Sequence, residues 1–512
     1  MELNLQRQTI TINETVFQVS VEQPIECDAL LPDYCPDIVK VLKCAATTHV
    51  DSTSISGNRL TIEGMAVIHV YYSTEQNQIR HAEYKVPFAK QAELRSSPEK
   101  PVVSITPSVD YINCRAVNQR RVDVRGAISF AVKVIDQKEQ KFISDASGGG
   151  IQLRREMVKV TDILGQNKSV LSVSEELELG YGKGQISSIV RSQYKVRAHE
   201  HKVVSGKVVV KGELVLHILY QPLEDPEALE VMEYTLPLSQ IIDSEYADED
   251  CLCDVEMFVI GCELASKAGD DGEYRAFGLE ARVGANVTVH KHSEIPVAGD
   301  CFSTKYETSC KRAPVSFIRL IDIVGEMISH KVTLDLPEGV ERLLDAWSDI
   351  ESMTWRQEAD ALVLDLKLSV CLFARMENKE CFYFEHPAEL SHTIALSEDC
   401  AEVQLEPTSD LTFSTYSLIG KEKIDMRFEV MVRGCVYCTV KSEAISDVSV
   451  DEEKVKVKEQ NKLYIYYAGA GERVWDIAKH YNTAPGAIWE ENSIESDALG
   501  EKRMLLIPIV SS

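Results

Sequence analysis

Residues 60–72, Leu-Thr-Ile-Glu-Gly-Met-Ala-Val-Ile-His-Val-Tyr-Tyr, alternate apolar and polar side chains along most of their length. Apolar side chains recur at even spacing and polar ones lie between them: Leu60, Ile62, Ala66, Ile68 and Val70 against Thr61, Glu63 and His69. A period of two is typical of a β-strand that buries one face. We therefore expect a long half-buried strand here, or a strand bent at Gly64.

The same stretch recurs twice, at constant offsets of 148 and 302 residues and without a gap. The aligned apolar sets are Leu60/Val208/Leu362, Ile62/Val210/Leu364, Ile68/Leu216/Val370 and Val70/Ile218/Leu372. An upstream block keeps both offsets: Ile38/Ile186/Val340, Val41/Ile189/Leu343 and Leu42/Val190/Leu344. Chance agreement among common apolar residues is the alternative, but two ungapped blocks favour an internal repeat. The i, i+3, i+4 spacing of the upstream block predicts one or two helical turns.

A later alternating segment also recurs, at residues 122–132, 277–289 and 426–440. Many strands with few helical patterns indicate sandwich or barrel modules. We therefore predict a mainly β protein of three tandem modules, at 1–150, 151–310 and 311–446. A charged linker is expected at 447–461, before a small terminal domain at 462–510.

The terminal segment has a strand pattern at each end and two short helical patterns between them, at 476–481 and 485–492. Pro485 stands in the first turn of the second helix, where proline is favoured. These features predict a βααβ unit.

The chain has 512 residues and is strongly acidic, with 54 Lys and Arg against 81 Asp and Glu, a net charge of −27. Such a surface repels phosphate backbones and anionic lipid, and no run of basic residues offsets it, so nucleic acid is a poor partner. No segment approaches the ~20 apolar residues that cross a bilayer. The start of the chain lacks the pattern of a signal peptide, so we expect a cytosolic protein whose 14 cysteines are reduced thiols. The alternative is a disulfide scaffold.

Motifs of catalysis are missing from the sequence. We find no P-loop, no G-x-S-x-G and no H-E-x-x-H, so we expect no catalytic residues, no cofactor and no enzyme activity. Cys435 and Cys438 form one C-x-x-C, but on a strand they point to opposite faces, so we expect no metal site there. His69, His217 and Cys371 fall at one repeated position, which we interpret as an inherited surface position.

The terminal segment resembles a LysM domain. The matching residues are Tyr466, Gly471, Glu472, Val474, Trp475, Ile477, Ala478, Tyr481, Thr483, Ile488, Asn492, Ser493, Ile494 and the closing 505–508 Leu-Leu-Ile-Pro. The resemblance implies a βααβ fold with a groove for N-acetylglucosamine polymers, between the loop after the first strand and the loop after the second helix. Here those loops carry Gly471-Glu472-Arg473 and Glu501-Lys502 where the family has Gly-Asp-Thr/Ser and Pro-Gly. Long charged side chains hinder a groove that must approach acetamido groups with backbone amides.

The repeats resemble a second family. Residues 30–38, Leu-Leu-Pro-Asp-Tyr-Cys-Pro-Asp-Ile, are similar to the Pro-Asp-x-x-Pro-Asp-Ile signature of SPOCS (spore coat) domains, and residues 60–72 to the strand that follows it. Repeats two and three lack the signature, so their resemblance to the family rests on their alignment with repeat one. Several SPOCS domains before a LysM domain are the arrangement of clostridial spore-morphogenesis proteins. That resemblance implies a non-enzymatic adaptor in the mother-cell cytoplasm, at the forespore surface, whose partner is the coat basal-layer ATPase, stage IV sporulation protein A.

We expect the terminal domain to dock a protein partner through Glu472, Arg473, Trp475 and Trp489. Trp475 fits a core position better than a contact. Two roles are open for Trp489: an anchor at a protein interface, or a ring that packs against the linker or repeat three. Two are also open for Arg473: an interface contact, or a solvated surface residue. The alternative function is a wall-anchored scaffold that binds peptidoglycan.

Overall fold

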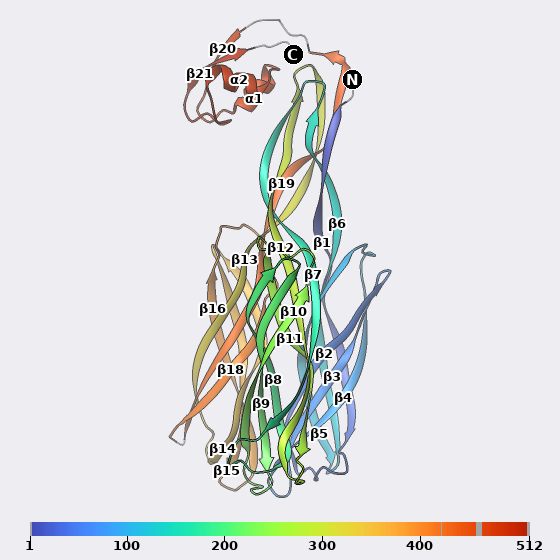
Figure 1. Cartoon of the computed structure of the whole chain (residues 1–512), viewed down its shortest axis with the longest axis vertical. Helices are drawn as coiled ribbons and strands as arrows, with labels where there is room; N and C mark the ends of the chain where they lie inside the picture. The colour runs from blue at the N-terminus through green and yellow to red at the C-terminus, as the bar shows by residue number, and fades with distance from the viewer. Residues whose placement is uncertain (1–2, 421, 457–462, 509–512) are drawn as a thin grey trace.

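The structure is a computed structural model that describes residues 3–420, 422–456 and 463–508. The molecule is long and narrow (Figure 1). A broad body of strands fills one end, a thinner stalk rises from it, and a small domain with two helices lies at the tip of the stalk. As the three repeats predict, the strands fall into three modules of one plan.

The elements of the modules follow the chain. Module 1 holds β1 (Asn4–Leu30), β2 (Lys40–Ser56), β3 (Arg59–Ser73), β4 (Ile79–Glu93), β5 (Pro101–Asn118) and β6 (Arg121–Ser147). Module 2 holds β7 (Ile151–Glu178), β8 (Ile186–Val204), β9 (Lys207–Pro222), β10 (Glu230–Asp243), β11 (Leu252–Ala268) and β12 (Tyr274–Ser303). Module 3 holds β13 (Tyr306–Asp335), β14 (Val340–Glu358), β15 (Ala361–Met376), β16 (Cys381–Ala395), β17 (Val403–Leu405), β18 (Thr408–Ile419) and β19 (Lys423–Val455).

Each module is a sandwich of two antiparallel sheets. In module 1 the sheets are β1-β6-β5 and β2-β3-β4, and in module 2 they are β7-β12-β11 and β8-β9-β10. Module 3 repeats the plan with β14-β15-β16 and β13-β19, while β17 and β18 share the remaining edge of β19. Both sheets of a module contribute to one apolar core. The prediction of a mainly β chain of sandwich-type modules is confirmed.

The stretch at 60–72 lies in β3, the middle strand of its sheet, as its alternation predicts. Leu60, Ile62 and Ile68 are fully buried. A Cβ on Gly64 would lie 2.1 Å from the carbonyl oxygen of His49 on β2, and one on Gly212 in β9 would lie 2.3 Å from that of Arg197 on β8. The two glycines therefore allow close approach of the neighbouring strand.

The helical turns expected near residues 38–42 are absent, and that prediction is wrong. β2 begins at Lys40, and its pairing with β3 shifts register between Val41 and Lys43. The same shift occurs between Ile189 and Arg191 in β8 and between Leu343 and Asp345 in β14. A bulge inserts one residue and breaks the period of two. The repeated bulge therefore imitates helical spacing in the sequence.

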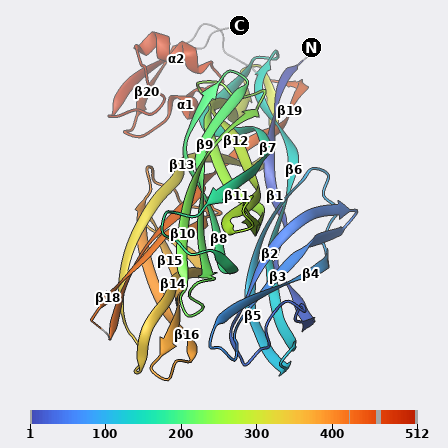
Figure 2. The ribbon, with the colours of Figure 1, turned by 60° about the horizontal axis from the view of Figure 1, so that its bottom comes forward.

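The three modules meet at an apolar centre. Figure 2 shows the strands of the three modules with the lower end of the molecule forward. We call the apolar centre the central cluster: Tyr71, Ile79, Val190, Leu219, Leu344, Trp347, Cys371, Phe373 and Cys381, with the partly buried Leu42, Leu229, Val231 and Tyr383. The bulge residues Leu42, Val190 and Leu344 contribute one per module, so the modules surround the centre with approximate threefold equivalence. The expected surface position of His69, His217 and Cys371 is wrong, because Cys371 is fully buried here and both histidines are partly buried.

Charged side chains join the modules around this centre. Arg191 of module 2 donates two hydrogen bonds to Asp345 of module 3, at 2.9 and 2.6 Å, and both side chains are buried. The Arg191 guanidinium also lies 4.3 Å from the Trp347 ring centroid. Lys43 of module 1 pairs with Glu385 of module 3 at 3.0 Å. Lys43, Arg191 and Asp345 occupy the repeated position just after the bulge.

The stalk consists of the paired ends of β1 with β6, β7 with β12 and β13 with β19 (Figure 1). Two apolar clusters fill it and draw side chains from all six strands, such as Ile10, Phe142, Val160, Ile295, Phe317 and Ala444. The three modules thus share one structure at the stalk as well as at the centre. β19 continues through Val455, so residues 447–455 of the expected linker form a strand, in keeping with the alternating Val of that stretch, and residues 457–462 lie outside the described part.

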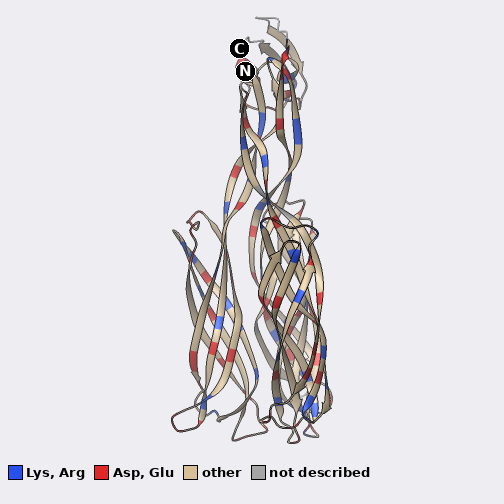
Figure 3. Cartoon of the chain, turned by 90° about the vertical axis from the view of Figure 1, so that its right-hand side faces the viewer, with Lys and Arg blue, Asp and Glu red and all other residues tan. Residues whose placement is uncertain are grey.

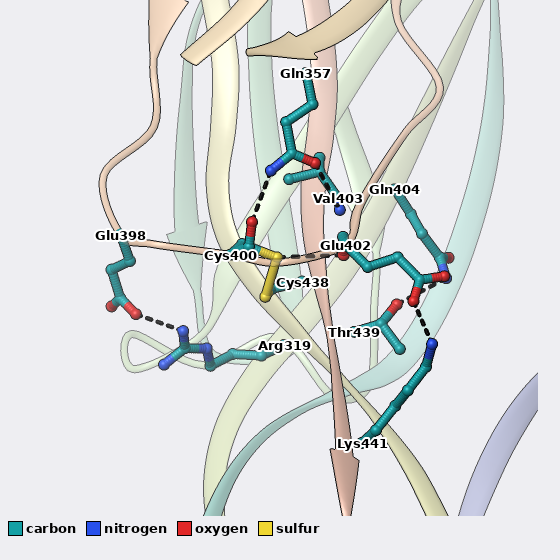
Figure 4. The surroundings of a disulfide bond; sticks show 10 residues. All are labelled: Arg319, Gln357, Glu398, Cys400, Glu402, Val403, Gln404, Cys438, Thr439 and Lys441. Carbon is teal, nitrogen blue, oxygen red and sulfur yellow. Dashed lines mark hydrogen bonds and ion pairs between the residues drawn. A yellow bond between two sulfur atoms is a disulfide. The ribbon is translucent and has the colours of Figure 1, made fainter. Parts of the chain in front are cut away.

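Two disulfides are present, so the expectation of reduced thiols is wrong for four cysteines. Cys44 on β2 pairs with Cys114 on β5 and links the two sheets of module 1. Cys400 pairs with Cys438 on β19 and ties the segment before β17 to that strand (Figure 4). Gln357 adds two hydrogen bonds here: its Nε2 donates to the Cys400 carbonyl at 2.6 Å, and its Oε1 accepts from the Val403 amide at 3.3 Å. Cys435, by contrast, is a free thiol.

Acidic and basic side chains are interspersed along the strands (Figure 3). Within the described ranges, no helix has the length and apolar character that a membrane crossing requires.

Candidate functional site

The terminal domain (residues 463–508) has the expected βααβ order: β20 (Leu463–Ala468), α1 (Val474–His480), α2 (Pro485–Asn492) and β21 (Arg503–Pro508). β20 and β21 pair antiparallel. Pro485 begins α2, where its missing N–H costs nothing, and Ser493 ends it in the left-handed conformation. Val474, Ile477, Ile488 and Leu505, among others, form the small core.

The loop after β20 and the loop after α2 are hydrogen-bonded to each other. The Gly471 amide donates to the Leu499 carbonyl at 2.7 Å, and the Leu499 amide donates to the Glu472 carbonyl at 3.0 Å. The Val474 amide donates to the Asp497 carbonyl at 2.8 Å. These three backbone amides therefore have partners inside the domain and are not open to a ligand.

The terminal domain is fastened to the stalk through Asp300 on β12. The buried Asp300 carboxylate accepts a hydrogen bond from the Trp475 indole at 2.8 Å and from Lys479 Nζ at 2.8 Å, and it pairs with Arg312 at 2.8 Å. The Trp475 ring meets Phe302 edge to face, with centroids 5.0 Å apart. We call this set the latch. Trp475 is thus a core residue, as predicted, and it also contacts the stalk.

The pKa of Asp300 follows from these contacts. Burial alone would raise it, but the hydrogen bonds from Lys479 and Trp475 and the charge of Lys479 outweigh burial and hold the pKa of Asp300 below its usual range. The carboxylate is therefore ionised at neutral pH and attracts the cation on α1. Lys456 adds a second fastening, since its ammonium donates to the Ser303 carbonyl at 3.0 Å and to Asn482 at 2.7 Å.

A cavity of about 450 Å³ lies between the terminal domain and β7 of the stalk. Its lining is Gln152, Leu153, Arg154, Arg155 and Glu156 from β7, Arg473, Trp475, Pro485, Gly486 and Trp489 from the start of α1 and α2, and Ser496, Asp497 and Ala498 from the loop after α2. Three of the four predicted site residues, Arg473, Trp475 and Trp489, therefore share one cavity. Glu472 is exposed and does not line the cavity. Its carboxylate accepts a hydrogen bond from the Tyr466 hydroxyl, and this raises the pKa of that phenol.

Trp489 is 36% exposed and lines this cavity. Of the alternatives for Trp489, packing against repeat three does not describe it, because the facing strand belongs to module 2. Arg154 and Arg155 are lining residues that the sequence did not reveal. In the sequence they are visible only as two adjacent basic residues in an acidic chain. The fold is what brings them to the same cavity as Arg473.

Within the described residues, no group of three or more His, Cys, Asp or Glu side chains is placed to hold a metal ion. Cys435 and Cys438 stand three positions apart on β19, and Cys438 is bound to Cys400.

Comparisons with known proteins agree with the repeat. No curated protein and no solved structure matches this chain. Residues 37–117 and 185–265 each match the family model described as SipL, SPOCS domain. Both ends of the second match lie 148 residues after those of the first, and the two matches cover β2–β5 of module 1 and β8–β11 of module 2. Both matched regions are therefore similar to SPOCS domains, and this similarity indicates a role related to sporulation.

Proposed function

We propose that this chain is a non-enzymatic adaptor of spore-envelope assembly. It would act in the mother-cell cytoplasm at the forespore surface and bind the coat basal-layer ATPase, a protein like stage IV sporulation protein A. The terminal domain serves as the docking module. The observation that carries this proposal is its placement at the tip of the stalk, with Arg473 and Trp489 beside a cavity, away from the body of the three modules.

The loop contacts favour protein docking over sugar binding. The amides of Gly471, Val474 and Leu499 already bond to carbonyls of the facing loop. Exposed Trp and Arg side chains are the residues that most often anchor protein interfaces. The strongly acidic chain, with a net charge of −27, would also favour a partner with a basic surface, so binding should weaken as salt increases.

Peptidoglycan binding is the second candidate. It is favoured by one observation, two tryptophans on a single cavity of about 450 Å³, since aromatic rings and a volume of this order suit a small glycan. If this candidate is right, the chain functions as a wall-anchored scaffold and not as an adaptor.

The test is calorimetric titration of the full chain with the purified ATPase and with a chito-oligosaccharide. Binding to the ATPase that is lost in Trp489→Ala and Arg473→Glu supports the adaptor. Tyr181→Ala and Arg95→Glu are matched controls, because both side chains are exposed and belong to modules 1 and 2 rather than to the terminal domain. Binding to the sugar alone would replace the adaptor with the scaffold.

A further inference from the structure

The cavity between the terminal domain and β7 reverses the charge of the molecule locally. Three arginines line it, Arg154, Arg155 and Arg473, in a chain whose net charge is −27. Arg155 pairs with Asp145. Among the described residues, Arg473 has no ion pair, and the Nε of Arg154 is buried without a hydrogen-bond partner. Two guanidinium groups are therefore left to be matched by an incoming acceptor.

The two carboxylates of the lining do not match them. Asp497 accepts the backbone amide of Trp475 at 2.8 Å, so it is engaged in holding the start of α1. Glu156 follows Arg154 by two positions on β7, yet it forms no ion pair with a described arginine. Arg154 and Arg473 thus keep positive charges that no described carboxylate pairs.

The wall of the cavity formed by β7 is a strand edge. β7 pairs with β12 on one side only, and residues 152–156 make no further backbone hydrogen bond within the described structure. Five consecutive residues of this edge line the cavity, so the unpaired edge borders the space. An open edge is a template for an added extended strand.

We propose that this cavity binds a short, extended, acidic peptide segment of a partner protein. The backbone of the peptide adds to the edge of β7, its carboxylates meet Arg154 and Arg473, and an apolar side chain rests on the exposed ring of Trp489. A neutral acetamido sugar can accept hydrogen bonds from a guanidinium group, but it carries no charge to pair with one and has no strand backbone to add to β7. The identity of the partner rests on the proposed function, but the chemistry of the segment does not.

The test uses a fluorescein-labelled hexapeptide of alternating Glu and Val, which places its carboxylates on one face when extended. Fluorescence anisotropy on the full chain should show saturable binding that weakens with salt. Arg473→Gln and Arg154→Gln should each weaken binding at least about tenfold, the loss of one charge-assisted hydrogen bond. Arg95→Gln, an exposed arginine of module 1, should change nothing.

Several outcomes would overturn the inference: no saturable binding to the folded wild type, equal binding of the Lys-Val counterpart, full affinity in Arg473→Gln, or displacement of the peptide by chitotetraose. Circular dichroism of each variant establishes that it is folded.

Titration with the ATPase separates this inference from the proposed function. If the ATPase binds the wild type and the acidic peptide does not, the acidic-segment inference fails and the adaptor stands. If the peptide binds and the ATPase does not, the proposed adaptor function is wrong and the acidic-segment inference remains supported.

Discussion

At the scale of single residues, the most consequential contact is the ion pair between Arg191 and Asp345. Both side chains are buried where modules 2 and 3 meet, and the guanidinium also stacks against Trp347. A buried pair is a weak source of net stability, because removing two ions from water costs about as much as their attraction returns. Breaking one partner is different, since the other charge is then left buried alone.

Asp345→Asn should therefore lower the free energy of unfolding by about 3–5 kcal/mol, measured by urea denaturation of the full chain. Arg356→Gln is the control, because Arg356 belongs to an exposed ion pair with Glu358 and should matter far less. An Asp345→Asn protein as stable as that control would show that the pair does not hold the modules together.

At the scale of elements, the sequence predicts what depends on local pattern. The alternation at 60–72 identifies β3, and the constant offsets identify its counterparts β9 and β15. Proline at the first turn of α2 and the apolar spacing of the terminal segment predict its βααβ order. The prediction failed where a bulge broke the period of two at Leu42, because a bulge and a helical turn leave the same spacing of apolar residues.

The candidate site could be predicted only in part, for a physical reason. Arg473, Trp475 and Trp489 lie within one domain of fewer than fifty residues, so a local resemblance locates them together. Arg154 and Asp300 reach the same region through strands of module 2, more than 170 residues away along the chain. No local pattern encodes contacts at such separations, and the same holds for the Cys400–Cys438 disulfide, which links positions 38 residues apart.

That disulfide should stabilise module 3 by closing a loop in the unfolded chain. The double variant Cys400→Ser/Cys438→Ser should lose about 2–4 kcal/mol in the free energy of unfolding. Reduction of the wild type also opens the Cys44–Cys114 bond, so it should give a loss at least as large. Cys27→Ser, which alters a free and partly buried thiol, serves as the control. If the double variant and the control unfold at the same urea concentration, the bond does not contribute.

Gly64 is the second test at this scale. Gly64→Ala would place a methyl group 2.1 Å from the backbone oxygen of His49, and a strand cannot yield as a flexible side chain does. We expect a loss of about 1–3 kcal/mol by urea denaturation. Gly325→Ala in β13 is the matched control, since a Cβ there meets nothing within 4 Å. Equal stability of the two variants would contradict the close approach of β2 and β3.

At the scale of the whole molecule, the latch at Asp300 decides where the terminal domain lies. The pKa of this carboxylate is lowered in the folded protein, so its contribution is present above the ordinary pKa of aspartate, about 3.9, and is lost as pH falls through the lower folded value. Acidification below about pH 4 should release the terminal domain from the stalk. Small-angle scattering and the fluorescence of Trp475, which loses its contact with Phe302, should report the change.

Asp300→Asn separates this effect from general acid unfolding. The amide still accepts the Trp475 indole but offers no charge to Lys479, so docking should be weaker at neutral pH and show no transition of its own. The same acid transition in the variant and the wild type would exclude Asp300 as its cause.

The bulge brings Lys43, Arg191 and Asp345 to equivalent places around the centre where the modules meet. Three identical subunits on a true threefold axis would have to present the same side chain three times, which means three like charges or three neutral groups. Joining the copies in one polypeptide removes that constraint. Each copy is free to diverge, so a cation on one module can face an anion on the next. The order of the modules around the centre is then fixed by their order along the chain.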